Sequence, residues 1–362
     1  MANKKMAILG GGHGAHTLAA DMKNRGHEVR LFEMPEFKKN VQKLFETKTI
    51  EVTGVAKYKA VLDMVTDDIE QAVNGAEYVF VVTPAFAHQA YAKLLKGRVR
   101  SDQNLVIFPG GFGALIFKKE FGQGDCPVIA ESNTLPYDTR LSEPCKIQLF
   151  GYNNLRLGFM PSERSAELNK KFREDLFDFG APYTDVLECS LSNANPCLHT
   201  GPCLLSVSSI ENPTINFFLY EHGFTPSAAK LNMALDNERK AVGRALGYKI
   251  TCMEDFSGLP ENFTWQQFYM SAHGQIALTP ISGPNDIFNR YLTEDVFCAL
   301  APWTGLGRQL GVDMPCMEAA VNIYSVIHET NWREKAYQVA DLGLDGLSVE
   351  QIRAYAQTGR KG

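Results

Sequence analysis

The sequence lacks the features that would place the protein in a membrane or on nucleic acid. It has no run of eighteen consecutive apolar residues, so we expect no transmembrane helix. The apolar run after the first lysines is too short for a secretory signal peptide. With 36 basic and 41 acidic side chains the net charge is −5, which gives no reason to expect a nucleic-acid or anionic-membrane partner. We therefore expect a cytoplasmic protein.

The eight cysteines include no C-x-x-C pair. In a reducing compartment such scattered cysteines are most simply buried thiols. Cys197, His199 and Cys203 lie close together in the sequence, but their spacing matches no structural zinc pattern. We therefore expect no metal site.

The order of the predicted elements indicates two domains in a chain of 362 residues. Strand patterns alternate with helical patterns in the first half, whereas helical patterns dominate after Glu188. We predict an α/β fold: a Rossmann-like, doubly wound parallel sheet over residues 1–187, followed by an all-α domain over residues 188–362.

A glycine-rich turn near the start of the chain joins a predicted strand (residues 6–9) to a predicted helix (residues 16–25). A second predicted strand follows over residues 28–32. This order is that of a dinucleotide-binding βαβ unit. The alternative is a glycine turn kept for packing alone.

Each residue type in the turn suits a pyrophosphate. Gly10 permits the tight turn, Gly12 lets the backbone approach the phosphates, and Ala15 stands where the helix must pack closely on the strand. The first turn of the helix then directs its N–H groups and positive dipole end at the phosphates. We assign to the cofactor site Gly10, Gly12, His13, Gly14 and Ala15, although His13 could be a bystander.

An acidic residue ends the second strand of this unit. Glu33 lies eighteen residues after Ala15, where its carboxylate can accept hydrogen bonds from the adenosine ribose. A 2′-phosphate would be repelled there, and Met34 follows rather than an arginine. We therefore expect NAD(H) rather than NADP(H) as the cofactor.

Two further loops, Thr83–His88 and Pro109–Gly113, follow predicted buried strands. Ligands on such sheets bind beyond the carboxyl ends of the strands, so both loops belong near the cofactor. Within the first loop we assign Thr83 and Pro84 to the cofactor site. We expect His88 to be an ordinary surface or helix-start histidine.

Two segments of the helical half carry candidate catalytic residues. The first, residues 195–202, contains His199, and the second, residues 289–296, contains Arg290 and Asp295. A lone histidine is more often structural than catalytic. We predict Thr293 as a helix N-cap, and acids in the following turn would merely stabilise the helix dipole.

The predicted helix over residues 227–246 carries three further charged side chains, Asp236, Glu238 and Arg239. Three interpretations remain open for them: a solvated face, a network of contacts between domains, or a direct role in binding substrate.

Seven motifs together resemble the octopine/nopaline (opine) dehydrogenase family in order and spacing. They are the glycine turn, TPAFAH, FPGGFGA, ESNTLPYDTR, NPCLHTGP, LDNERKAVGRALGY and RYLTEDV. The resemblance extends from about residue 5 to about residue 345. The chain is most similar to the bacterial N-(1-carboxyethyl) amino acid dehydrogenases.

The resemblance implies roles for three residues. His199 would be the catalytic acid/base, Asp295 would orient it, and Arg290 would bind the keto-acid carboxylate. The implied reaction is a reversible, NADH-dependent reductive condensation of an L-amino acid with a 2-keto acid, pyruvate being the expected one, through an imine. The implied partners are these small molecules, and a homodimer is plausible for the bacterial type.

Two alternatives remain. The first is another Rossmann-plus-helical reductase, such as a relative of ketopantoate reductase or glycerol-3-phosphate dehydrogenase. Those enzymes place a catalytic lysine early in the helical domain, where this chain has His199 and its nearest lysine is Lys230. The second alternative is a non-catalytic NAD-binding sensor.

Overall fold

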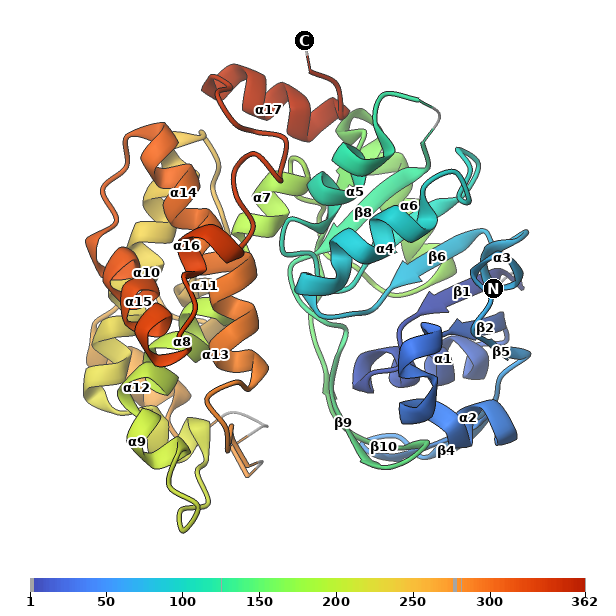
Figure 1. Cartoon of the computed structure of the whole chain (residues 1–362), viewed down its shortest axis with the longest axis horizontal. Coiled ribbons are helices and arrows are strands. Elements are labelled where there is room, and N and C mark those ends of the chain that lie inside the picture. Colours follow the sequence, from blue (N-terminus) through green and yellow to red (C-terminus); the bar gives the residue numbers. More distant parts are fainter. Residues whose placement is uncertain (1–2, 125, 276–278, 281, 362) are drawn as a thin grey trace. The chain divides into compact units, whose positions relative to one another are not determined.

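The computed structural model describes residues 3–124, 126–275, 279–280 and 282–361. The chain forms two compact units (Figure 1). The first unit comprises Met1–Ser190 and the residues from Ala354 onward, and the second comprises Leu191–Arg353. The domain limits expected from the sequence, 1–187 and 188–362, stay a prediction.

The first unit is built on a seven-stranded sheet. In spatial order its strands are β11 (Leu157–Met160), β8 (Val128–Ser132), β7 (Asn104–Ile107), β6 (Tyr78–Val81), β1 (Lys5–Leu9), β2 (Glu28–Phe32) and β5 (Met64–Thr66). Six strands are parallel and only the edge strand β11 runs antiparallel, beside β8. The order of the parallel strands is that of the doubly wound dinucleotide-binding fold, which confirms the predicted class.

Helices cover this sheet, so its central strands are buried throughout. All residues of β6, β7 and β8 are buried, as expected for parallel strands covered on both faces. The helices and 3-10 turns of the unit are α1 (His13–Asn24), η1 (Pro35–Val41), α2 (Gln42–Thr47), α3 (Ile69–Val73), η2 (Ala85–Ala87), α4 (His88–Leu95), α5 (Gly113–Phe121), η3 (Ser162–Arg164), α6 (Ser165–Asp175) and α7 (Val186–Leu191).

A second, four-stranded sheet packs on α1 in the same unit. Its strands, in spatial order, are β4 (Tyr58–Val61), β3 (Thr49–Gly54), β10 (Lys146–Tyr152) and β9 (Tyr137–Glu143). The Tyr137 hydroxyl donates to Asp21 Oδ2 at 2.8 Å, and the hydroxyls of Thr17 and Thr139 lie 2.8 Å apart. The parallel pairing of β3 with β10 joins two hairpins that are far apart in the sequence.

The described part of the second unit is helical (Figure 1). Its elements are α8 (Asn195–Leu205), α9 (Val207–Ile210), η4 (Leu219–Gly223), α10 (Pro226–Ala245), α11 (Met253–Ser257), α12 (Trp265–Ala272), α13 (Arg290–Asp295), η5 (Val296–Leu300), α14 (Ala301–Leu310), α15 (Pro315–Ile327) and α16 (Trp332–Lys335), and α17 (Val349–Thr358) follows them in the chain. The long helix α10 is central, because it contacts α8, α12, α14 and α15. Among the described residues, every helix is too short or too polar to cross a bilayer.

The glycine-rich loop after β7 is held by a fully buried carboxyl group. Glu131, near the end of β8, accepts hydrogen bonds from the backbone N–H of Ala114 at 2.7 Å and from the hydroxyl of Ser190. The same hydroxyl accepts from the backbone N–H of Phe112 at 3.0 Å. A side chain at Gly110 would place its Cβ 2.7 Å from Glu131 Cδ, so only glycine fits there.

We expect Glu131 to make the stability of the protein depend on pH. Burial raises the pKa of Glu131 to about 7, above its usual 4.5, so between these values the folded chain holds a proton that the unfolded chain has lost. The proton that the folded chain binds more tightly stabilises the fold. This stabilisation is fully present below the pKa of Glu131 in the unfolded chain and is lost as the pH rises through its pKa in the folded chain. Thermal melts should therefore show the wild type losing stability relative to Glu131→Gln from about pH 5 to about pH 8, by on the order of 3 kcal/mol. A difference between the two proteins that is constant over this range would contradict the expectation.

Candidate active site

The turn after β1 has the geometry of a phosphate-binding loop. Gly10 has a φ of +117°, and a Cβ there would lie 2.5 Å from the carbonyl oxygen of Val82. Gly12 is the N-cap of α1, has no side-chain cap, and precedes a first turn without acidic residues. A Cβ on Gly12 would meet no atom within 4 Å, so the space beside this N-cap is open.

Glu33 lies directly beside this turn. It follows β2, is 7% exposed, and accepts hydrogen bonds from the backbone N–H of Met34 at 2.8 Å and the hydroxyl of Tyr91 at 3.4 Å. Burial raises the pKa of this carboxyl group. A Cβ on Gly11 would collide with Glu33 Oε2, so Gly11 is needed for this approach. The glycine pattern alone does not indicate this role, because the partner comes from the next strand.

Of the other residues predicted to bind the cofactor, the structure places only some beside the glycine turn after β1. The Thr83 side chain is buried next to it, because its Cγ2 lies 3.0 Å from the position of a Cβ on Gly10. Pro84 is exposed in the same loop, and Ala15 is fully buried in the core, as close helix–strand packing requires. These loops leave β1 and β6, between which the strand order reverses.

His13 and Gly14 have neighbours that explain them without a ligand. The exposed His13 begins α1, and its Nδ1 accepts a hydrogen bond from the backbone N–H of Leu141 at 3.0 Å, which ties the helix to β9. A Cβ on Gly14 would lie 2.9 Å from Leu135 Cδ1, so glycine allows that leucine to pack there.

His88 is not at the surface. It begins α4 but is fully buried, and the position of a Cβ on Gly113 lies 2.9 Å from its Nδ1. Burial lowers the pKa of His88 to about 4, so its ring is neutral at physiological pH. It therefore supports the loop after β7 by packing and does not serve as an acid there.

In the second unit, the structure brings together the predicted histidine and aspartate. His199 lies on α8 and Asp295 on α13, and Nδ1 of His199 is 2.8 Å from Oδ2 of Asp295. Their side chains are 12% and 14% exposed, so the pair is shielded but open to a ligand. No described residue hydrogen-bonds Nε2 of His199, which leaves that nitrogen available to transfer a proton.

The helix that carries Asp295 begins earlier than predicted. Its N-cap is Asn289, whose side-chain oxygen accepts from the backbone N–H of Tyr291 at 3.1 Å, so the prediction of Thr293 as the N-cap is wrong. Tyr291 and Asp295 consequently stand one helical turn apart on the same face. The Tyr291 ring stacks on His199, with centroids 4.2 Å apart and planes 21° apart.

Arg290 stands on the adjacent stripe of the same helix. Its side chain is 57% exposed, whereas that of Glu294, one turn later, is 9% exposed. Arg290 Nη1 lies 3.6 Å from Glu294 Oε2, which holds the guanidinium near α13 while leaving most of it accessible. The exposed guanidinium can accept a ligand carboxylate.

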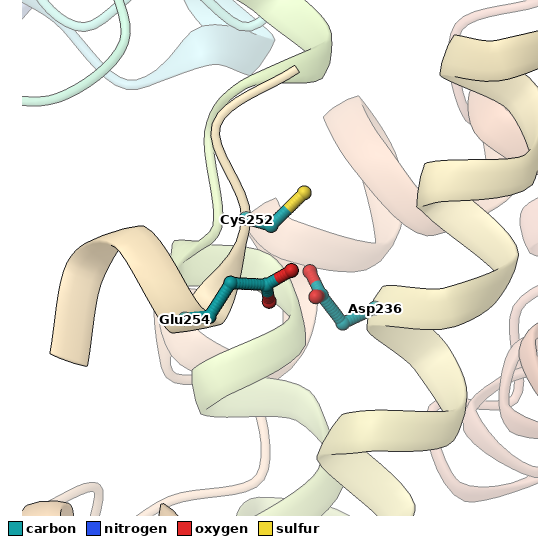
Figure 2. A group of neighbouring side chains, drawn as sticks. All are labelled: Asp236, Cys252 and Glu254. Atoms are coloured by element: carbon teal, nitrogen blue, oxygen red, sulfur yellow. The ribbon is translucent and has the colours of Figure 1, made fainter. Parts of the chain in front are cut away.

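A second group of potential ligand atoms lies elsewhere in this unit. The carboxyl groups of Asp236 and Glu254 face each other next to Cys252 (Figure 2), and the donor atoms of the three residues lie within 4.8 Å of one another. Two cations already neutralise these acids. Arg239 Nη2 is 2.5 Å from Asp236 Oδ1, and Lys240 Nζ is 2.7 Å from Glu254 Oε2.

This ion-pair network is structural. Burial raises the pKa of Cys252 to about 12, and its protonated thiol donates to the carbonyl of Ile250 at 3.2 Å. Arg239 also donates to the carbonyl oxygens of Leu191 and, at 3.0 Å, Thr251. Asp236 is 1% and Arg239 is 0% exposed, so a solvated face is wrong for them, and their partners are other protein groups.

Glu238, on the same helix α10, has a different structural role. Its carboxylate accepts hydrogen bonds from the backbone N–H groups of Cys316 at 2.8 Å and Met317 at 2.7 Å. Both residues lie in the first turn of α15, so Glu238 caps that helix and complements its dipole.

Comparison with known proteins finds similarity to one family along nearly the whole chain. Residues 182–328 match the model of the NAD/NADP octopine/nopaline dehydrogenase alpha-helical domain. Residues 5–122 match the N-terminal model of NAD-dependent glycerol-3-phosphate dehydrogenase. An opine dehydrogenase from Arthrobacter sp. (strain 1C) is 27% identical over 97% of this chain and 98% of its own. The chain is thus similar to the octopine/nopaline (opine) dehydrogenases, in its helical part and along nearly its whole length.

Further relatives and solved structures are similar to this chain over most of its length. A vitopine synthase of Allorhizobium ampelinum is 28% identical over 88% of this chain and 89% of its own. The solved structure of an octopine dehydrogenase with NADH and agmatine superposes with a TM-score of 0.76 at 20% identity, covering 99% of each chain. A ketopantoate reductase shares the fold, with a TM-score of 0.61 at 15% identity, over 90% of this chain and 98% of its own.

Proposed function

We propose that the protein is an NAD(H)-dependent opine dehydrogenase, which condenses the amine of an L-amino acid with a 2-keto acid and reduces the resulting imine. The observation that carries this proposal is the His199–Asp295 hydrogen bond on the helix pair that also presents Arg290. Solved octopine dehydrogenases with NADH and L-arginine, or NADH and pyruvate, support the substrate classes.

The first unit supplies the groups that fit the cofactor. The N–H groups at the start of α1 would bind the pyrophosphate, and Glu33 would accept hydrogen bonds from the adenosine ribose hydroxyls. Its negative charge would disfavour a 2′-phosphate, so we propose NAD(H) as the preferred form. When bound, NADH supplies the hydride that reduces the imine carbon.

The His199–Asp295 pair handles the protons. With Nδ1–H directed at Asp295, the neutral imidazole presents an unprotonated Nε2 that can accept a proton from the attacking amine. The carboxylate then stabilises the imidazolium, as in a hydrolase triad. The same Nε2–H can give this proton to the carbonyl oxygen, which becomes the hydroxyl group of the addition product. A second transfer of the same kind, from the nitrogen to this hydroxyl group, lets it leave as water and completes the imine.

Arg290 would orient the keto acid. A guanidinium binds a carboxylate through two parallel hydrogen bonds, and this fixes which face of the carbonyl carbon the amine and the hydride approach. A lysine at this position could attract the carboxylate but could not orient it equally well.

An assay tests the proposed function directly. The purified protein should oxidise NADH only when pyruvate and an amino acid are both present, and screening amino acids at fixed pyruvate would identify the amine substrate. Ketopantoate and dihydroxyacetone phosphate serve as control substrates, and turnover of either alone would favour the other reductases. We also propose that the protein is cytoplasmic and forms a homodimer. Gel filtration of the pure protein tests whether it is a dimer.

Replacing the histidine should remove catalysis but keep the cofactor. We expect His199→Gln to lower kcat by about 10²–10⁴-fold, because proton transfer at Nε2 is lost. The dissociation constant for NADH, measured by fluorescence titration, should stay unchanged, because the residues that fit the cofactor lie in the first unit. Full activity in this variant would support a role for the histidine in structure only.

Replacing the arginine should affect one substrate selectively. We expect Arg290→Lys to raise the KM for pyruvate by roughly 10–100-fold, because the bidentate contact is lost, with little change in the KM for NADH. Arg308→Lys is a matched control, since Arg308 is 50% exposed and pairs with Glu318 at 2.9 Å. An unchanged KM for pyruvate in the Arg290 variant would exclude the proposed contact.

Replacing the acid after β2 should change the choice of cofactor. We expect Glu33→Gln to raise the KM for NADH by roughly tenfold and to improve the relative use of NADPH, because the charge that repels the 2′-phosphate is gone. The exposed Glu36, three residues later, offers Glu36→Gln as a control. If the wild type, Glu33→Gln and Glu36→Gln use NADPH and NADH in the same ratio of kcat/KM, the adenosine ribose does not bind at Glu33.

A further inference from the structure

The imidazole of His199 is restrained on its face as well as at its edge. The hydrogen bond from Nδ1 to Asp295 fixes one edge of the ring, but a single hydrogen bond still allows the ring to tilt about that contact. The ring of Tyr291 covers one face, at a centroid distance of 4.2 Å and an interplanar angle of 21°. Together the two contacts determine where Nε2 points.

Both restraints come from one helix. Tyr291 and Asp295 are one turn apart on α13, which packs against α8, the helix that carries His199 (Figure 1). The Asn289 cap, which binds the backbone N–H of Tyr291, fixes the start of this helix and therefore the position of the tyrosine. The stack is thus built into the same short element as the aspartate.

The stack also suits the charge that His199 acquires during proton transfer. The face of an aromatic ring is electron-rich and attracts a cation, so a covered imidazolium is stabilised relative to one without the ring. The guanidinium carbon of Arg290 lies 5.6 Å from the centroid of the same ring. One tyrosine therefore contacts both the acid/base group and the proposed carboxylate anchor.

We propose that Tyr291 is a positioning residue for His199: its aromatic face holds the imidazole so that Nε2 faces the reacting amine and hydroxyl groups. The inference rests on the proposed function for its catalytic consequence. The aromatic ring of Tyr291 positions His199, and the hydroxyl group of Tyr291 does not contribute to this positioning.

Kinetics of two substitutions test this role. Tyr291→Phe keeps the aromatic face and should retain kcat within about twofold, whereas Tyr291→Leu should lower kcat by roughly 10–100-fold with little change in the KM for NADH. The chain offers a matched control in Tyr269, which stacks on His273 with centroids 4.8 Å apart. Tyr269→Leu should leave kcat unchanged.

Two kinetic outcomes would overturn the proposal. Wild-type kcat in Tyr291→Leu would show that the stack is dispensable. A loss in Tyr291→Phe as large as in Tyr291→Leu would show that the hydroxyl group acts instead of the ring.

A spectroscopic measurement separates this inference from the proposed function and from misfolding. With ¹³C at histidine Cε1, ring current from Tyr291 should shift the His199 signal upfield, and His199→Gln identifies that signal by its loss. The shift should persist in Tyr291→Phe and disappear in Tyr291→Leu, while the other histidine signals stay in place and report the intact fold. A His199 signal at the same position in Tyr291→Leu would overturn the proposal, even if the enzyme acts on no opine substrate.

Discussion

The hydrogen bond between His199 and Asp295 is the interaction on which the proposed proton transfer depends. It joins residues that are 96 positions apart in the sequence, and it forms only because α8 and α13 pack against each other. The buried ion pair of Asp236 with Arg239 fixes α10, on which α8 rests, and Arg239 also binds the backbone just before α8. The chemistry of one imidazole thus depends on a charge network deep in the helical core.

Much of the fold could be predicted because its signals are local. The glycine turn, the apolar runs of β1, β6 and β7, and the acid after β2 each reflect a physical requirement within a few residues. The second sheet could not be predicted as a whole, because its parallel pairing of β3 with β10 has no local signature. No local sequence pattern indicates that β11 is the antiparallel edge strand of the large sheet.

The candidate site shows the same limit at the level of single residues. The family resemblance points to Asp295 and Arg290, whereas a helix N-cap at Thr293 would leave Tyr291 outside the helix and hide its role. With Asn289 as the cap, the spacing of Tyr291 and Asp295 would have indicated a shared face. Gly11 and Glu131 were missed for another reason, since their importance depends on partners from distant strands and helices.

The chain path of the first unit has a consequence for biosynthesis. This unit is discontinuous: its residues up to Ser190 are separated from those beyond Ala354 by the whole helical unit. In the C-terminal part of this unit, Gly359 packs against the side chain of Lys118 on α5. The Gly359 carbonyl oxygen accepts a hydrogen bond from the Gln123 side chain at 3.4 Å. On the ribosome the nucleotide-binding unit therefore cannot acquire all of its native contacts until the inserted helices have emerged.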